Sequence, residues 1–243
     1  MVVVSVKNLV KDYVNLRAVD NISFNIDEGE IFGLIGPNGA GKTTTLRIIA
    51  TILTPTSGDI KIFGYDLRNE SQKIREIISY LPEEAGAYKN LSGLEYLNFM
   101  ASLYAKNRVD KEKFIENAIS IAKLDDRIKD KISTYSKGMV RKLLLSRSLM
   151  YKPKLAILDE PTSGLDVINS IEIREIIKSF TKLGTTVLLS SHNMLEVEFL
   201  SDRIALIDKG KILVEGKPED LKKEFKARNI EEVFIGAIKW KNF

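Results

Sequence analysis

A glycine-rich segment that follows a short apolar run is the feature that most limits what this chain can fold into. Residues 31–35 form an apolar candidate strand, and 43–53 have helical composition ending before a proline. Between them, the pattern Gly-x-x-x-x-Gly-Lys-Ser/Thr is matched by Gly36-Pro37-Asn38-Gly39-Ala40-Gly41-Lys42-Thr43. A strand, this loop and a helix in that order predict a phosphate-binding loop in an α/β fold.

Each part of the loop has a physical reason. The glycines let the backbone curl around phosphate oxygens, so that successive N–H groups point at the anion. The following helix presents the positive end of its dipole to the same oxygens. We expect Lys42 to contact the β- and γ-phosphates, Thr43 to offer a hydroxyl to Mg²⁺, and the nucleotide-binding segment to include Thr44. The alternative is a glycine-rich turn without a ligand, which the flanking strand and helix disfavour.

A second segment places two carboxylates after an apolar strand. Residues 155–158 are continuously apolar, as is typical of a parallel strand buried on both faces, and Asp159 and Glu160 follow directly. Ligands gather at the carboxyl ends of such strands. Asp159 is predicted to hold Mg²⁺ through water, and Glu160 to orient or deprotonate a water near the γ-phosphate. Taken alone, the pair is also explained as the cap of the next helix.

The rest of the chain alternates strands and helices, apart from residues 92–150, which are dominated by helix formers. This alternation predicts a mainly parallel sheet with crossover helices and a helical insert. The predicted strands are 2–9, 18–26, 31–35, 58–63, 78–81, 155–158, 186–189, 203–207 and 211–214, and the predicted helices outside the insert are 43–53, 69–77, 168–183 and 194–200.

Composition narrows the chemistry further. The chain has no cysteine, which excludes disulfides, thiolate nucleophiles and cysteine-based zinc sites, and its single histidine, His192, excludes a metal site built on two histidines. The formal net charge is +4 without a dense basic stripe, so no nucleic-acid partner is expected. No apolar run approaches the ~20 residues of a spanning helix, and residues 1–6 are expected to form a strand rather than a signal peptide.

Four more segments occur in a characteristic order: Tyr13 near the start, Tyr135-Ser136-Lys137-Gly138-Met139 at the end of the insert, Ser163-Gly164-Leu165-Asp166 after the carboxylates, and Ser190-Ser191-His192 after a strand. With the two motifs above, they make the chain resemble the ATP-binding cassette family from about residue 2 to residue 217. The Asn-Lys-x-Asp tetrapeptide expected of a GTPase is absent.

The resemblance implies a role for each segment. Tyr13 would stack on adenine, and Ser136, Lys137, Gly138 and Met139 would form the signature that acts on nucleotide bound to a partner cassette. Ser163 and Asp166 would belong to the D-loop. Glu160 would be the catalytic base, and His192 would bond the γ-phosphate and the water site across to Glu160. A lone histidine, taken without these motifs, is more simply a packed or surface imidazole.

Two positions depart from the family's pattern. Glu83 stands where the family has the glutamine of its Q-loop; a carboxylate can bind Mg²⁺ but cannot donate as an amide does. In the signature, Lys137 replaces a glycine and Met139 replaces a glutamine, while Ser136 and Gly138 are kept. Two interpretations of Lys137 stay open, a charge near the nucleotide or a side chain in solvent.

The resemblance therefore implies a P-loop NTPase of the α/β class, with a mainly parallel sheet, an antiparallel β subdomain near the N-terminus and a helical insert at about 86–152. It divides the chain into an ATPase domain, 1–217, and a tail, 218–243. ATP and Mg²⁺ are the implied cofactors.

The implied partners are a second cassette chain, favoured as an identical copy, and a separate integral membrane permease, as in single-domain exporter subunits. The chain itself is expected at the cytoplasmic face of the cell membrane, attached through that permease. The segment 229–234 resembles the end of those subunits. Two alternatives stay open: a soluble cassette ATPase acting on nucleic acid or ribosomes, and a P-loop enzyme of another kind, such as a small-molecule kinase.

Overall fold

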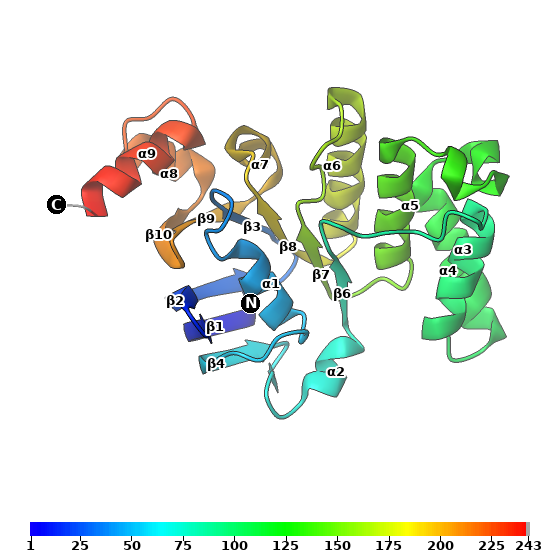
Figure 1. The fold of residues 1–243 in the computed structure, drawn as a ribbon, viewed down its shortest axis with the longest axis horizontal. Coiled ribbons are helices and arrows are strands. Elements are labelled where there is room, and N and C mark those ends of the chain that lie inside the picture. Colours follow the sequence, from blue (N-terminus) through cyan, green and yellow to red (C-terminus); the bar gives the residue numbers. More distant parts are fainter. Residues whose placement is uncertain (242–243) are drawn as a thin grey trace.

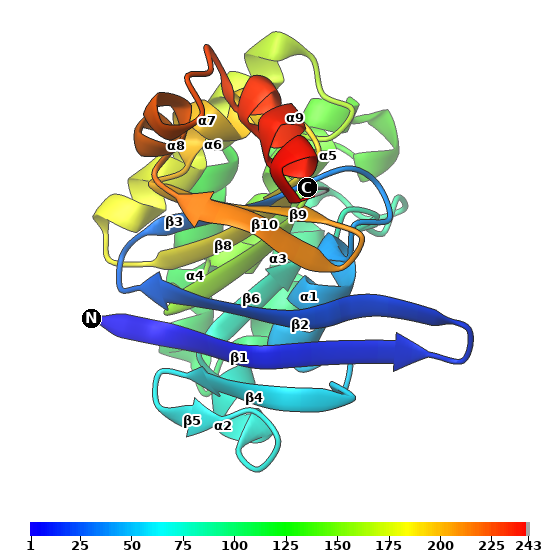
Figure 2. The same ribbon diagram turned by 90° about the vertical axis from the view of Figure 1, so that its left-hand side faces the viewer.

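The computed structural model describes residues 1–241, apart from the side chains at positions 196 and 241, and it contains two β-sheets. The first sheet is antiparallel and has the order β2-β1-β4-β5. Its long strands β1 and β2 pair along their whole length and face the viewer in Figure 2. The bounds are β1 (Val2–Tyr13), β2 (Leu16–Asp27), β4 (Ser57–Ile62) and β5 (Tyr65–Asp66).

The second sheet carries the candidate site. It has the order β10-β9-β3-β8-β7-β6, and all neighbours run parallel except the hairpin of β9 and β10. Because β7 pairs with β8 and β8 with β3 in parallel, their carboxyl ends meet at one edge of the sheet. The bounds are β3 (Ile31–Ile35), β6 (Ile78–Leu81), β7 (Leu155–Asp159), β8 (Thr186–Ser191), β9 (Arg203–Asp208) and β10 (Lys211–Gly216).

The parallel sheet contributes to a hydrophobic core on each of its faces. Successive side chains of a strand point to opposite faces. In β7, Ala156 and Leu158 pack with the helices of the insert, while Leu155 and Ile157 pack with the antiparallel sheet. Strands β3, β8 and β9 alternate in the same way. This explains why these strands are apolar throughout.

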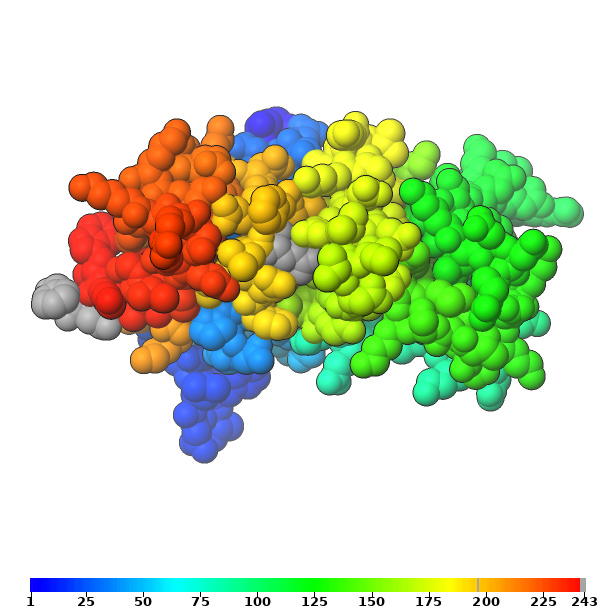
Figure 3. Space-filling model, turned by 90° about the horizontal axis from the view of Figure 1, so that it is seen from above, coloured from blue at the N-terminus to red at the C-terminus, as the bar shows by residue number. Residues whose placement is uncertain are grey.

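The helices flank the sheet in two sets. Helix α1 packs in the core shared with the antiparallel sheet, whereas α5, α6 and α7 pack on the other face. The insert lies at one end of the long axis and α8 and α9 lie at the other (Figures 1 and 3). The bounds are α1 (Lys42–Ile49), α2 (Ser71–Arg75), α3 (Gly93–Tyr104), α4 (Arg108–Ala122), η1 (Asp125–Lys129), η2 (Ile132–Thr134), α5 (Lys137–Leu149), α6 (Val167–Lys182), α7 (Met194–Leu200), α8 (Pro218–Glu224) and α9 (Ile230–Lys241).

The predicted fold class is confirmed, and several element boundaries were wrong. Strand β1 continues to Tyr13 rather than ending at Leu9, because it pairs with β2 up to the turn between them. Helix α1 ends at Ile49 instead of reaching residue 53, since the chain turns at Thr51, where φ is +62°. Helix α2 covers only Ser71–Arg75 of the predicted 69–77.

The division into 1–217 and a tail stays a prediction, and part of it, 242–243, lies outside the described residues. In the described part, α9 packs against α7 and α8 and buries Ile230, Val233 and Ala237. Within residues 1–241, none of the helices combines the length and the apolar character that a membrane span needs.

Candidate functional site

The loop between β3 and α1 requires glycine at two positions. At Gly36 an added Cβ would lie 2.0 Å from the carbonyl oxygen of Ile207, so there is no room for any side chain at this position. At Gly41 φ is +103°, and a Cβ would lie 2.4 Å from the carbonyl oxygen of Ala18. Gly41 is also the N-cap of α1 and makes no side-chain capping bond, so the first amides of the helix receive no cap from it. The strand, loop and helix therefore occur where the sequence predicts them, with the helix dipole directed into the loop.

The Lys42 side chain lies inside this loop. It is buried, and its Nζ donates to the carbonyl oxygens of Gly36 at 2.7 Å and Pro37 at 3.2 Å. The same Nζ lies 3.6 Å from Oε1 of Glu160, a carboxylate that is equally buried. The Lys42 cation is thus held between two carbonyl groups of the loop and a carboxylate that lies 118 residues after Lys42 in the sequence.

Asp159 ends β7 and receives three hydroxyl donors. Its Oδ1 accepts from Ser190 at 2.5 Å and from Thr43 at 3.2 Å, and its Oδ2 accepts from Tyr80 at 3.3 Å. Burial, and next the negative charge of Asp159, raise the pKa of Tyr80, so that this phenol stays a neutral donor. Thr43 and Asp159, both predicted Mg²⁺ ligands, are therefore in direct contact between the first turn of α1 and the end of β7.

Glu160 follows at once and lies between two of the other predicted residues. Its Oε2 is 2.9 Å from Nδ1 of His192, while its Oε1 faces Lys42. Its backbone is in the left-handed region, with φ of +47°, which is costly for a residue with a side chain. The structure thus brings Lys42, Thr43, Asp159, Glu160 and His192 together at the carboxyl ends of β3, β7 and β8.

The signature residues lie elsewhere. Ser136 is the N-cap of α5 and accepts a bond from the Met139 amide at 3.2 Å, with Lys137 exposed beside it. A Cβ on Gly138 would clash with the side chain of Asn169 at 2.2 Å. Within residues 1–241, no hydrogen bond or ion pair joins these four residues to the loop at 36–44.

Three predicted residues sit at the margins of the site. Tyr13 is the last residue of β1 and its ring is about half exposed, with Nζ of Lys11 at 5.2 Å from the ring centre. Glu83 is exposed and accepts from Oγ of Ser163 at 3.4 Å, which links the Q-loop and D-loop positions. Asp166 caps α6 through the Asn169 amide at 2.9 Å.

Sequence reasoning assigned no role to three residues that shape the site. Ser190 bonds Asp159 and accepts from the Glu160 amide at 3.1 Å; Tyr80 bonds Asp159; and Arg141 contacts the backbone around Glu160. For Ser190 a signal was present, namely a polar residue at the carboxyl end of an apolar strand. For Tyr80 and Arg141 the partners are 18 to 79 residues away, and no local pattern indicates them.

The donor set suits a Mg²⁺–nucleotide complex. A threonine hydroxyl and a carboxylate are hard oxygen ligands, and Mg²⁺ is usually bound by one or two protein oxygens together with substrate phosphates. Among the described residues, no group of three or more His, Cys, Asp or Glu side chains is placed to hold a metal by itself. Thr43 and Asp159 therefore fit the phosphate-linked type of site, which needs no such group.

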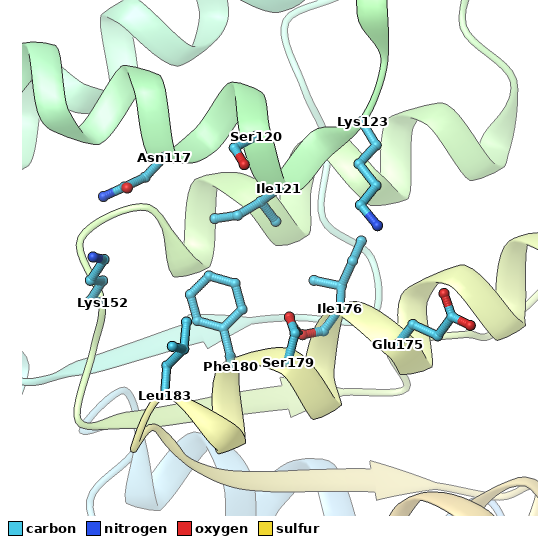
Figure 4. Close-up of a pocket in the computed structure, with 10 residues that line it drawn as sticks. All are labelled: Asn117, Ser120, Ile121, Lys123, Lys152, Glu175, Ile176, Ser179, Phe180 and Leu183. Carbon is cyan, nitrogen blue, oxygen red and sulfur yellow. Dashed lines mark hydrogen bonds between the residues drawn. The ribbon is translucent and has the colours of Figure 1, made fainter.

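A separate hollow of about 360 Å³ lies between α4 and α6 (Figure 4). Its floor is apolar, with Ile121, Ile176 and Phe180, and Lys123 and Lys152 stand at its rim. None of the motif residues lines it, so it is distinct from the candidate nucleotide site.

Known proteins with similar sequences are ATP-binding proteins, in agreement with the geometry of the site. Residues 19–163 match a family model described as ABC transporter. The linearmycin resistance ATP-binding protein LnrL of Bacillus subtilis is 38% identical over 96% of this chain and 75% of its own length. The daunorubicin/doxorubicin resistance ATP-binding protein DrrA of Streptomyces peucetius is 37% identical over 90% of this chain and 66% of its own length. The bacitracin transport ATP-binding protein BcrA of Bacillus licheniformis is 36% identical over 91% and 72%.

Solved structures give the same picture. One described as the ATP binding subunit of an ABC transporter superposes with a TM-score of 0.84 and 27% identity, covering 97% of this chain and 99% of the other. The cassette MJ0796, solved as a dimer in a post-hydrolysis state bound to ADP and Pi, gives a TM-score of 0.79 and 26% identity, covering 88% and 98%.

Proposed function

This chain belongs to the ABC transporter family, and on that premise we propose that it is the ATP-binding and ATP-hydrolysing subunit of a transporter whose membrane-spanning part is a separate chain. The observation that carries the proposal is the convergence of Lys42, Asp159, Glu160 and His192 at one edge of the parallel sheet. The alternative of a soluble cassette acting on nucleic acid or ribosomes has no support in the named relatives.

Each residue has a chemical task in this proposal. Lys42 and the loop amides bind the β- and γ-phosphates, while Thr43 and Asp159 hold Mg²⁺, which neutralises phosphate charge when bound. Glu160 accepts a proton from the attacking water, and His192, 2.9 Å away, orients the Glu160 carboxylate and bonds the γ-phosphate. The exposed ring of Tyr13 stacks on adenine. Glu83 stays a proposed third oxygen ligand for Mg²⁺.

We further propose export of a small molecule. The support is the description of the relatives, which name resistance to linearmycin, resistance to daunorubicin and doxorubicin, and transport of bacitracin. The membrane subunit would recognise the substrate, while this chain would lie at the cytoplasmic face of the membrane, bound to that subunit.

The separation of the signature from the loop supports a head-to-tail dimer. Ser136 and its neighbours make no bond to the P-loop of their own chain, and they stand at an exposed helix N-terminus suited to an anion. In the proposal, they close over the ATP of a second copy, and ATP binding closes the dimer while hydrolysis opens it. The similar cassette MJ0796 was solved as a dimer, which supports the pairing of two copies.

Complementation between two inactive chains tests the dimer. A Ser136→Arg chain has a working loop but a blocked signature, and a Lys42→Ala chain has the reverse. Mixed at equal concentration, they are expected to form one repaired site per mixed dimer and to recover a quarter of the wild-type ATPase rate, or half of it after the mixed dimer is isolated through two affinity tags. Each variant mixed with itself is the control. A mixture no more active than the two controls would contradict the head-to-tail arrangement.

An aromatic cluster beside the Q-loop is the proposed docking site for the membrane subunit. Tyr88 and Phe99 are exposed, and their ring centres lie 5.8 Å apart, with Tyr96 beneath at 6.0 Å from Tyr88. Exposed aromatic residues are enriched at the energetic centres of protein interfaces. The cluster joins the 83–88 loop to the insert, so a partner bound there would contact both.

Replacing Tyr88 and Phe99 with serine is expected to weaken binding to the co-expressed membrane subunit by about 30-fold or more, because even one aromatic anchor contributes about 2 kcal/mol or more at such centres. Co-purification from detergent-solubilised membranes measures the loss. The ATPase rate of the isolated subunit should stay within about twofold. Phe199→Ser, which removes an even more exposed ring on α7, is the control. Equal loss in both variants would argue against the docking site.

A further inference from the structure

The buried side chain of Arg141, on α5, uses all of its donors on backbone carbonyl groups. Its Nε donates to Pro161 at 2.7 Å, one terminal nitrogen to Pro82 and Glu83 at 3.2 Å each, and the other to Asp159 at 3.0 Å and Glu160 at 2.5 Å. A guanidinium has five N–H groups, and here five bonds are made. The side chain thus joins α5 to two loops that carry predicted site residues.

This arrangement is uncommon for a buried cation. Buried arginines are normally paired with a carboxylate, because an unpaired charge loses its hydration without compensation. None of the ion pairs among the described residues includes Arg141, which is only 8% exposed. Burial lowers the pKa of Arg141. The negative charges of Glu83, Asp159 and Glu160 oppose that shift, although none of these carboxylates forms an ion pair with the guanidinium. Arg141 therefore contacts backbone carbonyl groups rather than a carboxylate.

Three of the five carbonyl groups, those of residues 159–161, belong to a strained turn. Glu160 is in the left-handed conformation, which costs a non-glycine residue about 1–2 kcal/mol. Its amide donates to the carbonyl and the hydroxyl of Ser190 at 3.2 and 3.1 Å, and its carbonyl accepts from Arg141. The backbone is therefore held on both sides of the Cα atom, and the Cα position decides where the carboxylate points, toward Lys42 and His192.

We propose that Arg141 is a positioning residue for ATP hydrolysis, which holds the backbone of Glu160 in the conformation that directs its carboxylate and which acts within its own subunit. The inference rests on the proposed function. The inference adds a connection that the motifs do not contain. Helix α5 begins at the signature, which acts on the nucleotide of the partner subunit, and Arg141, five residues after Ser136, supports the catalytic base of its own subunit.

The two sites that α5 serves allow a test that separates positioning from simple damage to the helix. The reference is the isolated mixed dimer of a Ser136→Arg chain and a Lys42→Ala chain, whose one repaired site takes Glu160 from the first chain and the signature from the second. Arg141→Met, which keeps the apolar stem, is added to one chain or to the other. ATP affinity and turnover are measured in each case.

With Arg141→Met in the Ser136→Arg chain, turnover is expected to fall about 10²-fold at an ATP affinity within threefold, since a displacement near 1 Å costs about that much. In the Lys42→Ala chain the same change should lower turnover by less than threefold. Equal losses in both placements would mean that the change damages the subunit as a whole. A loss confined to the Lys42→Ala chain would mean that the change acts through the signature helix, and no loss in either would mean that Arg141 does not position Glu160. Each of these three results overturns the proposal.

Two further variants serve as a control for α5 and as a substitute for Arg141→Met. Arg147→Met lies on the same helix and removes a bond to the Tyr96 hydroxyl at 3.3 Å, so it reports on α5 alone and should leave turnover within twofold. If Arg141→Met does not fold, Arg141→Lys takes its place in both chains. It keeps the charge but cannot bond five carbonyls, so an asymmetric loss of about tenfold is expected, and a symmetric loss or none overturns the proposal.

An inactive reference dimer would contradict the head-to-tail arrangement rather than the role of Arg141. In that case, Arg141→Met is introduced as the only change, in every chain. Turnover lowered about 10²-fold at unchanged ATP affinity supports the positioning role, and unchanged turnover overturns the proposal.

Discussion

Glu160→Gln is expected to leave ATP bound while the turnover rate falls by about 10²–10⁴-fold, the range expected for loss of a general base. The amide has the shape of the carboxylate but cannot accept the proton of the attacking water. Because a negative charge beside Lys42 is removed, ATP affinity should be unchanged or higher. Single-turnover hydrolysis and equilibrium binding of ATP, measured on the same protein, check both parts.

The control for this variant is Glu76→Gln, an exposed carboxylate at the end of α2, which should hydrolyse ATP at the normal rate. A further check uses the 2.9 Å contact between Glu160 and His192. If both act on one water, the Glu160→Gln, His192→Ala double variant should be little slower than the slower single variant, because residues that act as a unit are not additive. Normal hydrolysis by Glu160→Gln would remove this residue from the mechanism.

Lys42→Ala is expected to abolish measurable ATP binding at concentrations that saturate the wild type, a loss of about 10²-fold or more. Hydrogen bonds to charged groups contribute about 1.5–3 kcal/mol each, and Lys42 is expected to contact two phosphates. Stability should fall too, since removing one partner of a buried ion pair leaves the other charge uncompensated, at about 3–5 kcal/mol. Calorimetric titration with ATP and urea unfolding measure the two effects.

The double variant Lys42→Ala, Glu160→Gln separates binding from folding. It removes the stranded carboxylate, so most of the lost stability should return, while ATP binding should stay absent. Lys61→Ala, an exposed lysine on β4, is the matched control and should change neither quantity. ATP affinity that survives in Lys42→Ala would mean that the loop at 36–43 is not the phosphate site.

The sequence indicated those parts of the molecule that depend on neighbours along the chain. The loop before α1 could be predicted, because β3, the loop and α1 are consecutive along the chain. The apolar residues 155–158 likewise predicted a buried strand with carboxylates at its end. The alternation of strands and helices was enough for the fold class.

Features set by tertiary contacts could not be predicted in this way. The extension of β1 to Tyr13 depends on pairing with β2, since Lys11 and Asp12 do not continue an apolar pattern. The strand order that places Ser190 beside Asp159 follows from packing, not from local preference. Arg141 gave no signal at all, because an arginine in a helix is ordinarily a solvated surface residue and its carbonyl partners lie up to 59 residues away.

Because side chains alternate along the central strands, neither side of the parallel sheet is expected to unfold independently of the other. Each of β3, β7, β8 and β9 supplies residues to the packing on both of its sides, so loosening the insert side withdraws support from the antiparallel side as well. Cooperativity follows: both regions should melt in a single transition. A ligand held only at the strand ends would then raise the melting temperature of the whole chain, including the C-terminal helices far from it.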